Sequence, residues 1–406
     1  MTRSSAAAIV LLTAAILAGA TRADDYPHAR EPIASVRQVY DGTLTPDLAV
    51  STFRNIDRLF PSRTIRHGEH VAALPRAQRG LGALKFTSRG RDWDLFDYLA
   101  VNRVAGLLVL KDGAVALELY QYGNTERTRW MSMSVAKSIT STLIGAAIKD
   151  GAIASIDDPV SRYVPALAGS AYDGVSVRDI LMMSSGVRWD ETYTNPASDR
   201  RRLLEVQIEQ RPGAAIALMG KLPRAAPPGT VFNYNTGETL VAGEILYNAV
   251  KRPLADYLSD RIWKPCGMEA DATWWLGSPD GVEIAGSGFA ATLRDYGRFG
   301  QFILNGGKAG NEQVLPEGWM QAASARQHLK SGKLLDYGYY WWPATPTAAT
   351  PDPAGGFMAE GIFGQFLYVN PRERVVVVVW SARSKPEDMD IIDDVDFFGA
   401  VARALH

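Results

Sequence analysis

The sequence predicts an α/β (α+β) fold, with an antiparallel β-sheet flanked by helices and a second, mostly helical lobe. Two β-prone runs, residues 105–110 and 114–123, are joined by an Asp-Gly turn signal and predict a hairpin. Strand patterns return late in the chain, at residues 364–370 and in the apolar run VVVVVW at 375–380. Between them, residues 150–330 carry mostly helical patterns broken by Pro and Gly. Strands on both sides of a helical middle indicate one sheet that distant parts of the chain complete.

The N-terminus has the layout of a secretory signal peptide. Arg3 precedes an apolar run at residues 6–17, and small residues follow, so cleavage is expected after Ala20 or Ala23. The run is shorter than the roughly 20 residues that span a bilayer, which argues against a membrane anchor. We therefore assign residues 1–23 to the signal and expect a periplasmic or secreted protein without a stable membrane anchor.

The composition indicates a folded protein whose partner is a small molecule. The chain has 406 residues, of which 47% are hydrophobic, enough for a large core. Its 43 Lys and Arg residues nearly balance its 44 Asp and Glu residues, so no long-range field favours nucleic acid. The single cysteine, Cys266, excludes an intramolecular disulfide. Residues 24–90 show only weak patterns and receive no assignment.

A serine and a lysine stand three positions apart in the segment MSMSVAK, residues 131–137. The apolar stripe that follows predicts a helix over residues 134–148, with Gly151 as its stop. Lys137 would then lie one turn from Ser134 on the same helix face. A serine hydroxyl becomes a good nucleophile when a nearby base takes its proton, and a lysine with a lowered pKa is such a base. The ordinary alternative is a helix cap beside a solvated lysine, and the pair alone does not decide between the two.

A second motif, PPGTVFNYNTGE at residues 227–238, strengthens the catalytic interpretation. It resembles the second motif of the serine β-lactamase and penicillin-binding-protein superfamily. There, a Pro-Gly-Thr turn leads to a tyrosine whose hydroxyl joins the serine and the lysine. Tyr234 holds that place, and Thr236 stands where the family carries Asn. The resemblance implies that the Thr236 hydroxyl contacts the substrate.

The resemblance runs from about residue 95 to residue 400 and is strongest to one branch of the superfamily. The segments SVAKS, SSGVRWDETYTNPASD and GIFGQ are most similar to the 6-aminohexanoate-dimer hydrolases and related esterases, which are related to the class C β-lactamases. It implies a β-lactamase-like serine hydrolase domain over residues 91–406. Within it we expect an α/β lobe formed by residues 91–149 and 335–406, and a helical lobe formed by residues 150–334.

The late strand departs from the family pattern. Ala359, Glu360 and Gly361 fill the places of Lys-Thr-Gly or His-x-Gly, so the basic residue that pairs with a substrate carboxylate is absent. The resemblance implies an oxyanion hole formed by the backbone N–H groups of Ser134 and Ile362. It also implies that Gly361 allows a close approach of the ligand.

The implied reaction is hydrolysis of a small-molecule ester or amide. Lys137 and Tyr234 would deprotonate Ser134, an acyl-enzyme would form, and water activated by the same pair would release the acid. Which of the two is the base in each step stays open, because coupled sites share their protons. The family branch also has a loop tyrosine that closes over the substrate. Tyr193 is its best match, and an ordinary loop aromatic is the alternative.

Other interpretations have less support in the sequence. A Ser-His-Asp hydrolase needs a histidine base, and the five histidines of the chain come without any Gly-x-Ser-x-Gly elbow. His67 and His70 could begin a metal site, but no further ligand cluster follows, and we expect neither a metal nor a cofactor. A β-lactam-hydrolysing or penicillin-binding protein, or a non-catalytic cell-wall binding relative, stays open because a fold does not fix a function.

Overall fold

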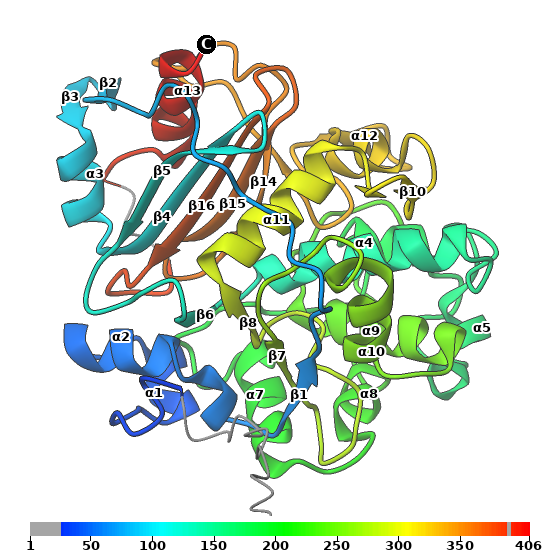
Figure 1. Ribbon diagram of the computed structural model, residues 1–406. Helices are drawn as coiled ribbons and strands as arrows, with labels where there is room; N and C mark the ends of the chain where they lie inside the picture. The colour runs from blue at the N-terminus through cyan, green and yellow to red at the C-terminus, as the bar shows by residue number, and fades with distance from the viewer. Residues whose placement is uncertain (1–25, 388–390) are drawn as a thin grey trace, which may run out of the picture.

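The computed structural model describes residues 26–387 and 391–406 and shows two larger β-sheets with helices packed around and between them (Figure 1). The expected signal, residues 1–23, lies outside the described residues. Within the described ranges, no helix combines the length and the apolar character needed to cross a bilayer. The predicted fold class, mixed α and β with antiparallel sheets, is confirmed.

The larger sheet consists of β4 (Val104–Lys111), β5 (Ala114–Tyr120), β13 (Trp342–Pro343), β14 (Phe357–Gly361), β15 (Gln365–Asn370) and β16 (Val375–Ser381). Its strands are antiparallel in the order β13-β14-β15-β16-β4-β5. The predicted hairpin forms β4 and β5, and the predicted late strands form β15 and β16. Because β16 pairs with β4, with Val378 opposite Leu108, distant parts of the chain complete this sheet as expected.

Helices cover both faces of the larger sheet. On one face lies α11 (Leu293–Leu304), which approaches the strands closely: a Cβ on Gly297 would stand 2.5 Å from Leu108, and one on Gly300 would stand 2.5 Å from Val376. The other face is covered by α3 (Leu95–Val101) and α13 (Asp394–Ala404). The central strands β4, β15 and β16 are therefore buried on both sides along nearly their whole length, which explains their apolar sequences.

The smaller sheet consists of β1 (Ser62–Ile65), β6 (Arg129–Met131), β7 (Ala272–Trp275) and β8 (Phe289–Thr292), in the order β1-β7-β8-β6. The sequence does not predict it, because β7 and β8 lie in the region interpreted as mostly helical. Both strands have four residues and are buried throughout, so neither length nor alternation marks them. Two-residue ladders also form, namely β9 (Lys308–Ala309) with β10 (Glu312–Gln313) and β11 (Gln327–His328) with β12 (Leu334–Leu335).

The central helix is α4 (Val135–Lys149), which confirms the helix predicted over residues 134–148. Its residues are buried on every side from Val135 to Ala147, as is typical of a helix in the middle of a protein. It contacts β14 and α9 (Thr236–Val250). Gly151 ends it with a φ of +75°. The other helices around it are α5 (Val160–Tyr163), α6 (Val177–Leu181), α7 (Asp199–Glu209), α8 (Ala214–Met219), α10 (Leu254–Leu258), α12 (Trp319–Ser324) and the short turns η3 (Pro165–Leu167) and η4 (Ser259–Trp263).

The N-terminal segment, which the sequence leaves unassigned, packs along both sheets. It forms α1 (Val36–Asp41), α2 (Pro46–Phe53), the turn η2 (Ile56–Arg58) and the edge strand β1, and it ends in the hairpin of β2 (Lys85–Ser88) and β3 (Arg91–Asp94). Between β1 and β2 it crosses to the larger sheet (Figure 1), where the Val115 N–H donates to the Pro75 carbonyl at 2.7 Å. The division of the rest of the chain into two lobes at the boundaries given above stays a prediction.

Candidate active site

Ser134 lies in the turn between β6 and α4, where the two larger sheets meet. Trp130 of β6 stacks on Trp380 of the larger sheet with ring centroids 5.7 Å apart. The Trp130 indole N–H also donates to Gln365 Oε1 of β15 at 2.9 Å. Met133 then turns the chain with a φ of +43°, a left-handed conformation that residues with side chains rarely adopt. Ser134 directly precedes α4, so strand, turn and helix together fix its position.

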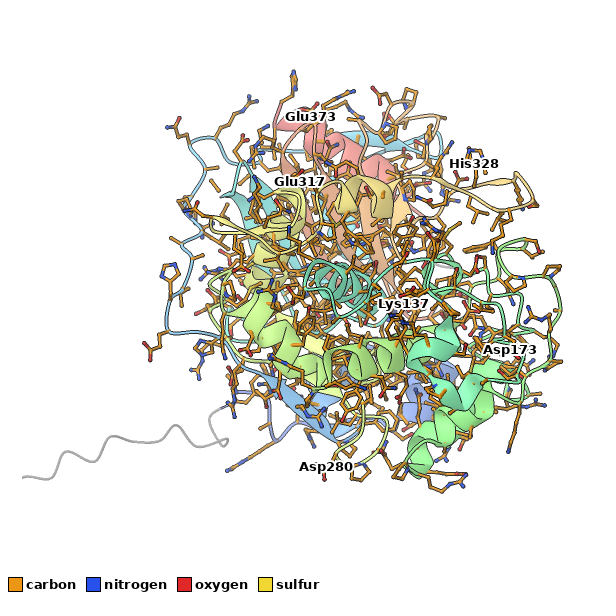
Figure 2. All side chains as sticks on the ribbon, turned by 90° about the vertical axis from the view of Figure 1, so that its right-hand side faces the viewer. Lys137, Asp173, Asp280, Glu317, His328 and Glu373 are labelled. Carbon is orange, nitrogen blue, oxygen red and sulfur yellow. The ribbon has the colours of Figure 1, made fainter. Side chains whose placement is uncertain are left out.

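Lys137 lies one turn further along α4, inside the molecule (Figure 2). Its Nζ is 2.8 Å from Ser134 Oγ, and it also donates to the Gly286 carbonyl at 3.1 Å. Only 2% of Lys137 is exposed. This burial lowers the pKa of its amine to about 7, a change that Arg200 favours and Glu191 opposes. A substantial fraction of the amine is therefore uncharged at neutral pH.

Tyr234 reaches the same point from the residues that precede α9. Its ring stacks on Trp342 with centroids 6.0 Å apart and planes at 26°. Lys137 Nζ lies 5.2 Å from the centre of the Tyr234 ring. Burial and the Glu191 carboxylate raise the pKa of Tyr234, and a hydrogen bond with Ser134 acts in the opposite direction. The structure thus brings together the side chains of both sequence motifs, while their catalytic roles stay a prediction.

The end of β14 approaches the serine turn so closely that only glycine fits. A Cβ on Gly361 would lie 2.5 Å from the Ser132 carbonyl oxygen and 3.0 Å from the Ser134 backbone nitrogen. Ile362 follows and lines the same cavity as Ser134, and Phe363 then turns the chain with a φ of +66°. Two backbone segments therefore meet beside the serine, as an oxyanion hole requires. That the N–H groups of Ser134 and Ile362 form this hole stays a prediction.

Glu191 is a cavity residue that the sequence analysis did not single out. Its carboxylate accepts hydrogen bonds from the Thr236 hydroxyl at 2.5 Å, from the Thr236 backbone N–H at 2.9 Å and from the Trp189 indole at 2.5 Å. Thr236 is 3% exposed and is not among the residues that line the cavity, and its predicted contact with the substrate stays a prediction. One glutamate among many acidic residues carries no sequence signal, and only the folded contact with Thr236 reveals it.

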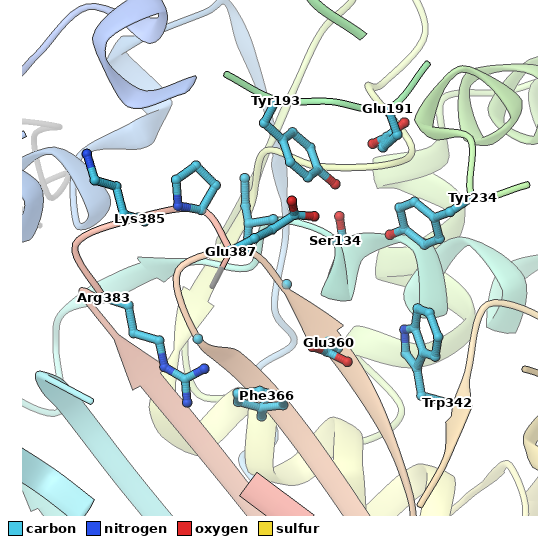
Figure 3. Close-up of a pocket in the computed structure, with 14 residues that line it drawn as sticks. Ser134, Glu191, Tyr193, Tyr234, Trp342, Glu360, Phe366, Arg383, Lys385 and Glu387 are labelled. Atoms are coloured by element: carbon cyan, nitrogen blue, oxygen red, sulfur yellow. The ribbon is translucent and has the colours of Figure 1, made fainter. Parts of the chain in front are cut away.

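Ser134, Glu191 and Tyr234 line a cavity of about 550 Å³ (Figure 3). Tyr193 forms part of its wall, with the hydroxyl directed toward Ser134, and is only 5% exposed. On β14, Ala359 is fully buried and its neighbour Glu360 faces the cavity. The remaining lining residues are Trp342, Gly361, Ile362, Gly364, Phe366, Arg383, Lys385, Pro386 and Glu387.

The cavity wall carries charges of both signs: the acidic residues are Glu191, Glu360 and Glu387, and the basic residues are Arg383 and Lys385. Arg383 binds both carboxylate oxygens of Asp394 at 2.8 Å. Lys385 Nζ donates to the Gly42 carbonyl at 2.9 Å. Both cations are thus held by groups outside the cavity wall, which weakens their attraction for a ligand.

The residues that the alternative interpretations would use do not line this cavity. His67 is 40% exposed, and its Nε2 is 3.8 Å from Asp271 Oδ1. In the part of the chain that the structure describes, no group of three or more His, Cys, Asp or Glu residues is placed to hold a metal ion. Burial raises the pKa of the Cys266 thiol to about 12, which disfavours the reactive thiolate.

Two solved structures with this fold match this chain over nearly the whole of their own length. One is a Bacillus anthracis protein described as a candidate 6-aminohexanoate-dimer hydrolase, with a TM-score of 0.76 and 23% identity over 88% of this chain and 94% of that one. The other is a penicillin-binding protein homologue from Caulobacter crescentus, with a TM-score of 0.56 and 17% identity over 76% of this chain and 98% of that one. At these identities the likeness shows the fold alone.

Sequence comparison gives the family. The 6-aminohexanoate-dimer hydrolase of Paenarthrobacter ureafaciens is 30% identical over 308 residues, which cover 72% of this chain and 76% of that protein. The family model named Beta-lactamase matches residues 98–399, a stretch that contains Ser134, Lys137 and Tyr234. The chain therefore belongs to the Beta-lactamase family and is a serine hydrolase of the β-lactamase fold.

Proposed function

We propose that the protein hydrolyses an ester or amide bond of a small molecule through an acyl-enzyme on Ser134. The observation that carries this proposal is the buried amine of Lys137, which lies 2.8 Å from Ser134 Oγ and has a pKa of about 7. An uncharged amine at this distance can take the hydroxyl proton while the oxygen attacks a carbonyl carbon. A lysine on a solvent-exposed helix surface would instead be hydrated and would keep its charge.

In this mechanism Lys137 and Tyr234 share the proton of Ser134. Ser134 Oγ attacks the carbonyl carbon, and the backbone N–H groups of Ser134 and Ile362 stabilise the negative carbonyl oxygen. The carbon–oxygen or carbon–nitrogen bond then breaks, and the leaving alcohol or amine takes a proton from the pair. Water that gives a proton to the same pair attacks the acyl-enzyme, which releases the acid and restores the Ser134 hydroxyl. The apparent pKa of the reaction belongs to the pair, because the two groups are coupled.

Esters and linear amides are the favoured substrates, with a specificity like that of the 6-aminohexanoate-dimer hydrolases. One relative bears that name, and another is named D-aminopeptidase. On β14, where other branches of the family carry a basic residue, this chain has Ala359, and the neighbour that faces the cavity is Glu360. A substrate carboxylate at this point would be repelled, which disfavours penicillin-type ligands.

A β-lactam-hydrolysing or penicillin-binding protein is the alternative with the same fold, and a non-catalytic cell-wall binding relative is another. Hydrolysis of nitrocefin in preference to esters would favour the first. Labelling of Ser134 by a fluorophosphonate without turnover of any ester or amide would favour the last.

Replacement of the nucleophile tests the proposal directly. Ser134→Ala should lower kcat for p-nitrophenyl butyrate by about 10⁴-fold or more, since no other group can form the acyl-enzyme. Ser141→Ala is a matched control, because Ser141 is a buried serine of the same helix whose hydroxyl has no hydrogen-bond partner among the described residues. It should keep wild-type activity. Near-normal turnover in folded Ser134→Ala would refute the proposed mechanism.

The pH dependence of kcat/KM should follow the amine of Lys137. Protonated Lys137 cannot accept a proton, so activity should fall as the pH drops below about 7. Glu191 raises the pKa of Lys137, so Glu191→Gln should move this acid limb to lower pH, by roughly half a unit to one unit. Glu209→Gln, a change at an exposed glutamate paired with Arg211, should leave the limb in place. If the acid limb of Glu191→Gln lies at the same pH as in the wild type, or at a higher pH, the assignment of this limb to Lys137 is wrong.

Substrate preference should reflect the charge of Glu360. The wild-type protein should hydrolyse p-nitrophenyl butyrate with a larger kcat/KM than nitrocefin, which carries a carboxylate. Glu360→Gln removes one repulsive charge, worth about 1 kcal/mol or less near a protein surface, and should raise kcat/KM for nitrocefin severalfold while the neutral ester changes little. A wild-type preference for nitrocefin would show that Ala359 and Glu360 do not set the specificity.

We also propose that the protein is exported to the periplasm or beyond, on the basis of the N-terminal sequence. Expression of the full chain in a Gram-negative host should give a periplasmic protein whose first residue follows Ala20 or Ala23. Cell fractionation and N-terminal sequencing would measure this. Recovery of uncleaved protein from the cytoplasm alone would argue against export.

A further inference from the structure

We propose that residues 36–53 are part of the active site and that Tyr40 is a positioning residue that holds Tyr193 in the cavity wall. We call this segment the N-terminal clamp; it comprises α1, the loop with Gly42, and α2. The clamp precedes residues 98–399, which the family model matches, yet it contacts the cavity-lining residues Tyr193 and Lys385. The inference rests on the proposed function, because it gives Tyr193 a contact with the substrate.

Tyr40 packs directly on Tyr193. The two ring centroids are 6.3 Å apart with planes at 27°, and both side chains are buried, with 2% and 5% exposed. The guanidinium carbon of Arg200 lies 4.3 Å from the centre of the Tyr40 ring. Among the described residues, Arg200 Nε and Nη1 have no hydrogen-bond partner, so the ring supplies a favourable contact for this buried cation. Tyr40 therefore cannot turn away from Tyr193 without also uncovering Arg200.

An ion pair ties the backbone of Tyr193 to the same helix. Asp41, the last residue of α1, lies with its Oδ1 2.7 Å from Arg201 Nη1. The same nitrogen donates to the Tyr193 carbonyl at 3.1 Å. The Arg201 side chain is only 7% exposed, while the Asp41 carboxylate is 39% exposed, so solvent and salt screen this pair in part. The ring and the carbonyl of Tyr193 are thus both held from α1.

The clamp also contacts the part of the cavity wall that contains Lys385 and Pro386. The Gly42 carbonyl accepts a hydrogen bond from Lys385 Nζ at 2.9 Å, and a Cβ on Gly42 would lie 3.1 Å from Pro386 Cδ. Phe53 of α2 packs against Phe363, which turns the chain at the end of β14, with ring centroids 5.1 Å apart. One continuous segment therefore contacts two parts of the cavity wall and the turn at Phe363, which lies between the lining residues Ile362 and Gly364.

This support holds Tyr193 in a fixed place in the cavity wall. The Tyr193 hydroxyl points toward Ser134 (Figure 3). Tyr40 does not line the cavity, so it acts on the site through the two residues on which it packs, Tyr193 and Arg200. A displacement of about 1 Å at a reacting centre can cost on the order of a hundredfold in rate. Loosening Tyr40 should therefore lower turnover although it removes no group that touches the substrate.

A double-mutant cycle on the full chain tests this inference, with rates expressed per Ser134 labelled by a fluorophosphonate. Tyr40→Leu should lower kcat/KM for p-nitrophenyl butyrate by about tenfold or more. Tyr40→Phe keeps the ring and should stay near the wild-type value. In the Tyr193→Phe background, Tyr40→Leu should cost about twofold or less, because the hydroxyl that it positions is already absent.

Phe60→Leu is the matched control. Phe60 is a buried aromatic of the same N-terminal segment, but it packs on Trp275 and does not line the cavity. It should lower the melting temperature without changing kcat/KM per labelled serine. If Tyr40→Leu does not fold, Asp41→Asn replaces it, since this change at a 39% exposed carboxylate weakens only the hold on Arg201. It should give a smaller loss that again disappears with Tyr193→Phe.

Three results would overturn the inference: wild-type rates in Tyr40→Leu, equal losses in both Tyr193 backgrounds, or an equal loss in Phe60→Leu. If Tyr40→Leu does not fold, wild-type rates in Asp41→Asn would overturn the inference. None of these results affects the proposed function, which the Ser134→Ala variant tests separately.

Discussion

The buried amine of Lys137 is the constraint on which the rest of the structure depends. Removing an amine from water disfavours its charged form, and lowering the pKa from 10.5 to about 7 corresponds to roughly 5 kcal/mol. The fold must exclude water from this one nitrogen and still leave it beside Ser134. Helix α4 does so because it is buried on every side. Gly286 also helps, since a Cβ there would collide with Thr239 and stand 3.5 Å from Lys137 Nζ.

Much of the fold follows from local sequence patterns, and the missing parts are non-local. The hairpin of β4 and β5 and the helix α4 are predicted because neighbouring residues carry their signals, namely an Asp-Gly turn and a long apolar stripe. The smaller sheet has no such signal. It forms because Ser62 pairs with Trp275 and Met131 pairs with Ala290, contacts between strands of three or four residues. Such short strands are stable only when the surrounding core buries them.

The candidate site shows the same division. Ser134, Lys137 and Tyr234 can be found in the sequence because helix geometry and motif order place them together. Thr236 was assigned from its motif position, and the sequence could not show that its hydroxyl donates to a carboxylate that lines the cavity. Glu191 binds Thr236 across 45 residues of chain, so its place depends on how two loops fold against each other. Tyr40 comes from a segment with weak patterns, and only tertiary packing reveals its contact with Tyr193.

Glu191 affects both the geometry of the site, through its hydrogen bonds, and the pKa of Lys137, through its charge. It lies close to Tyr193 in the chain and is hydrogen-bonded to Thr236, which lies close to Tyr234, so it ties the Tyr193 wall to the start of α9. The same carboxylate raises the pKa of Lys137, while burial and Arg200 lower it. A neutral amide at this position could retain some of these hydrogen bonds, but it would leave a less basic amine. A less basic amine is uncharged over a wider range of pH yet draws the serine proton less strongly. In the proposed mechanism, the carboxylate therefore sets the balance between how much of the amine is uncharged near neutral pH and how effective the amine is as a base.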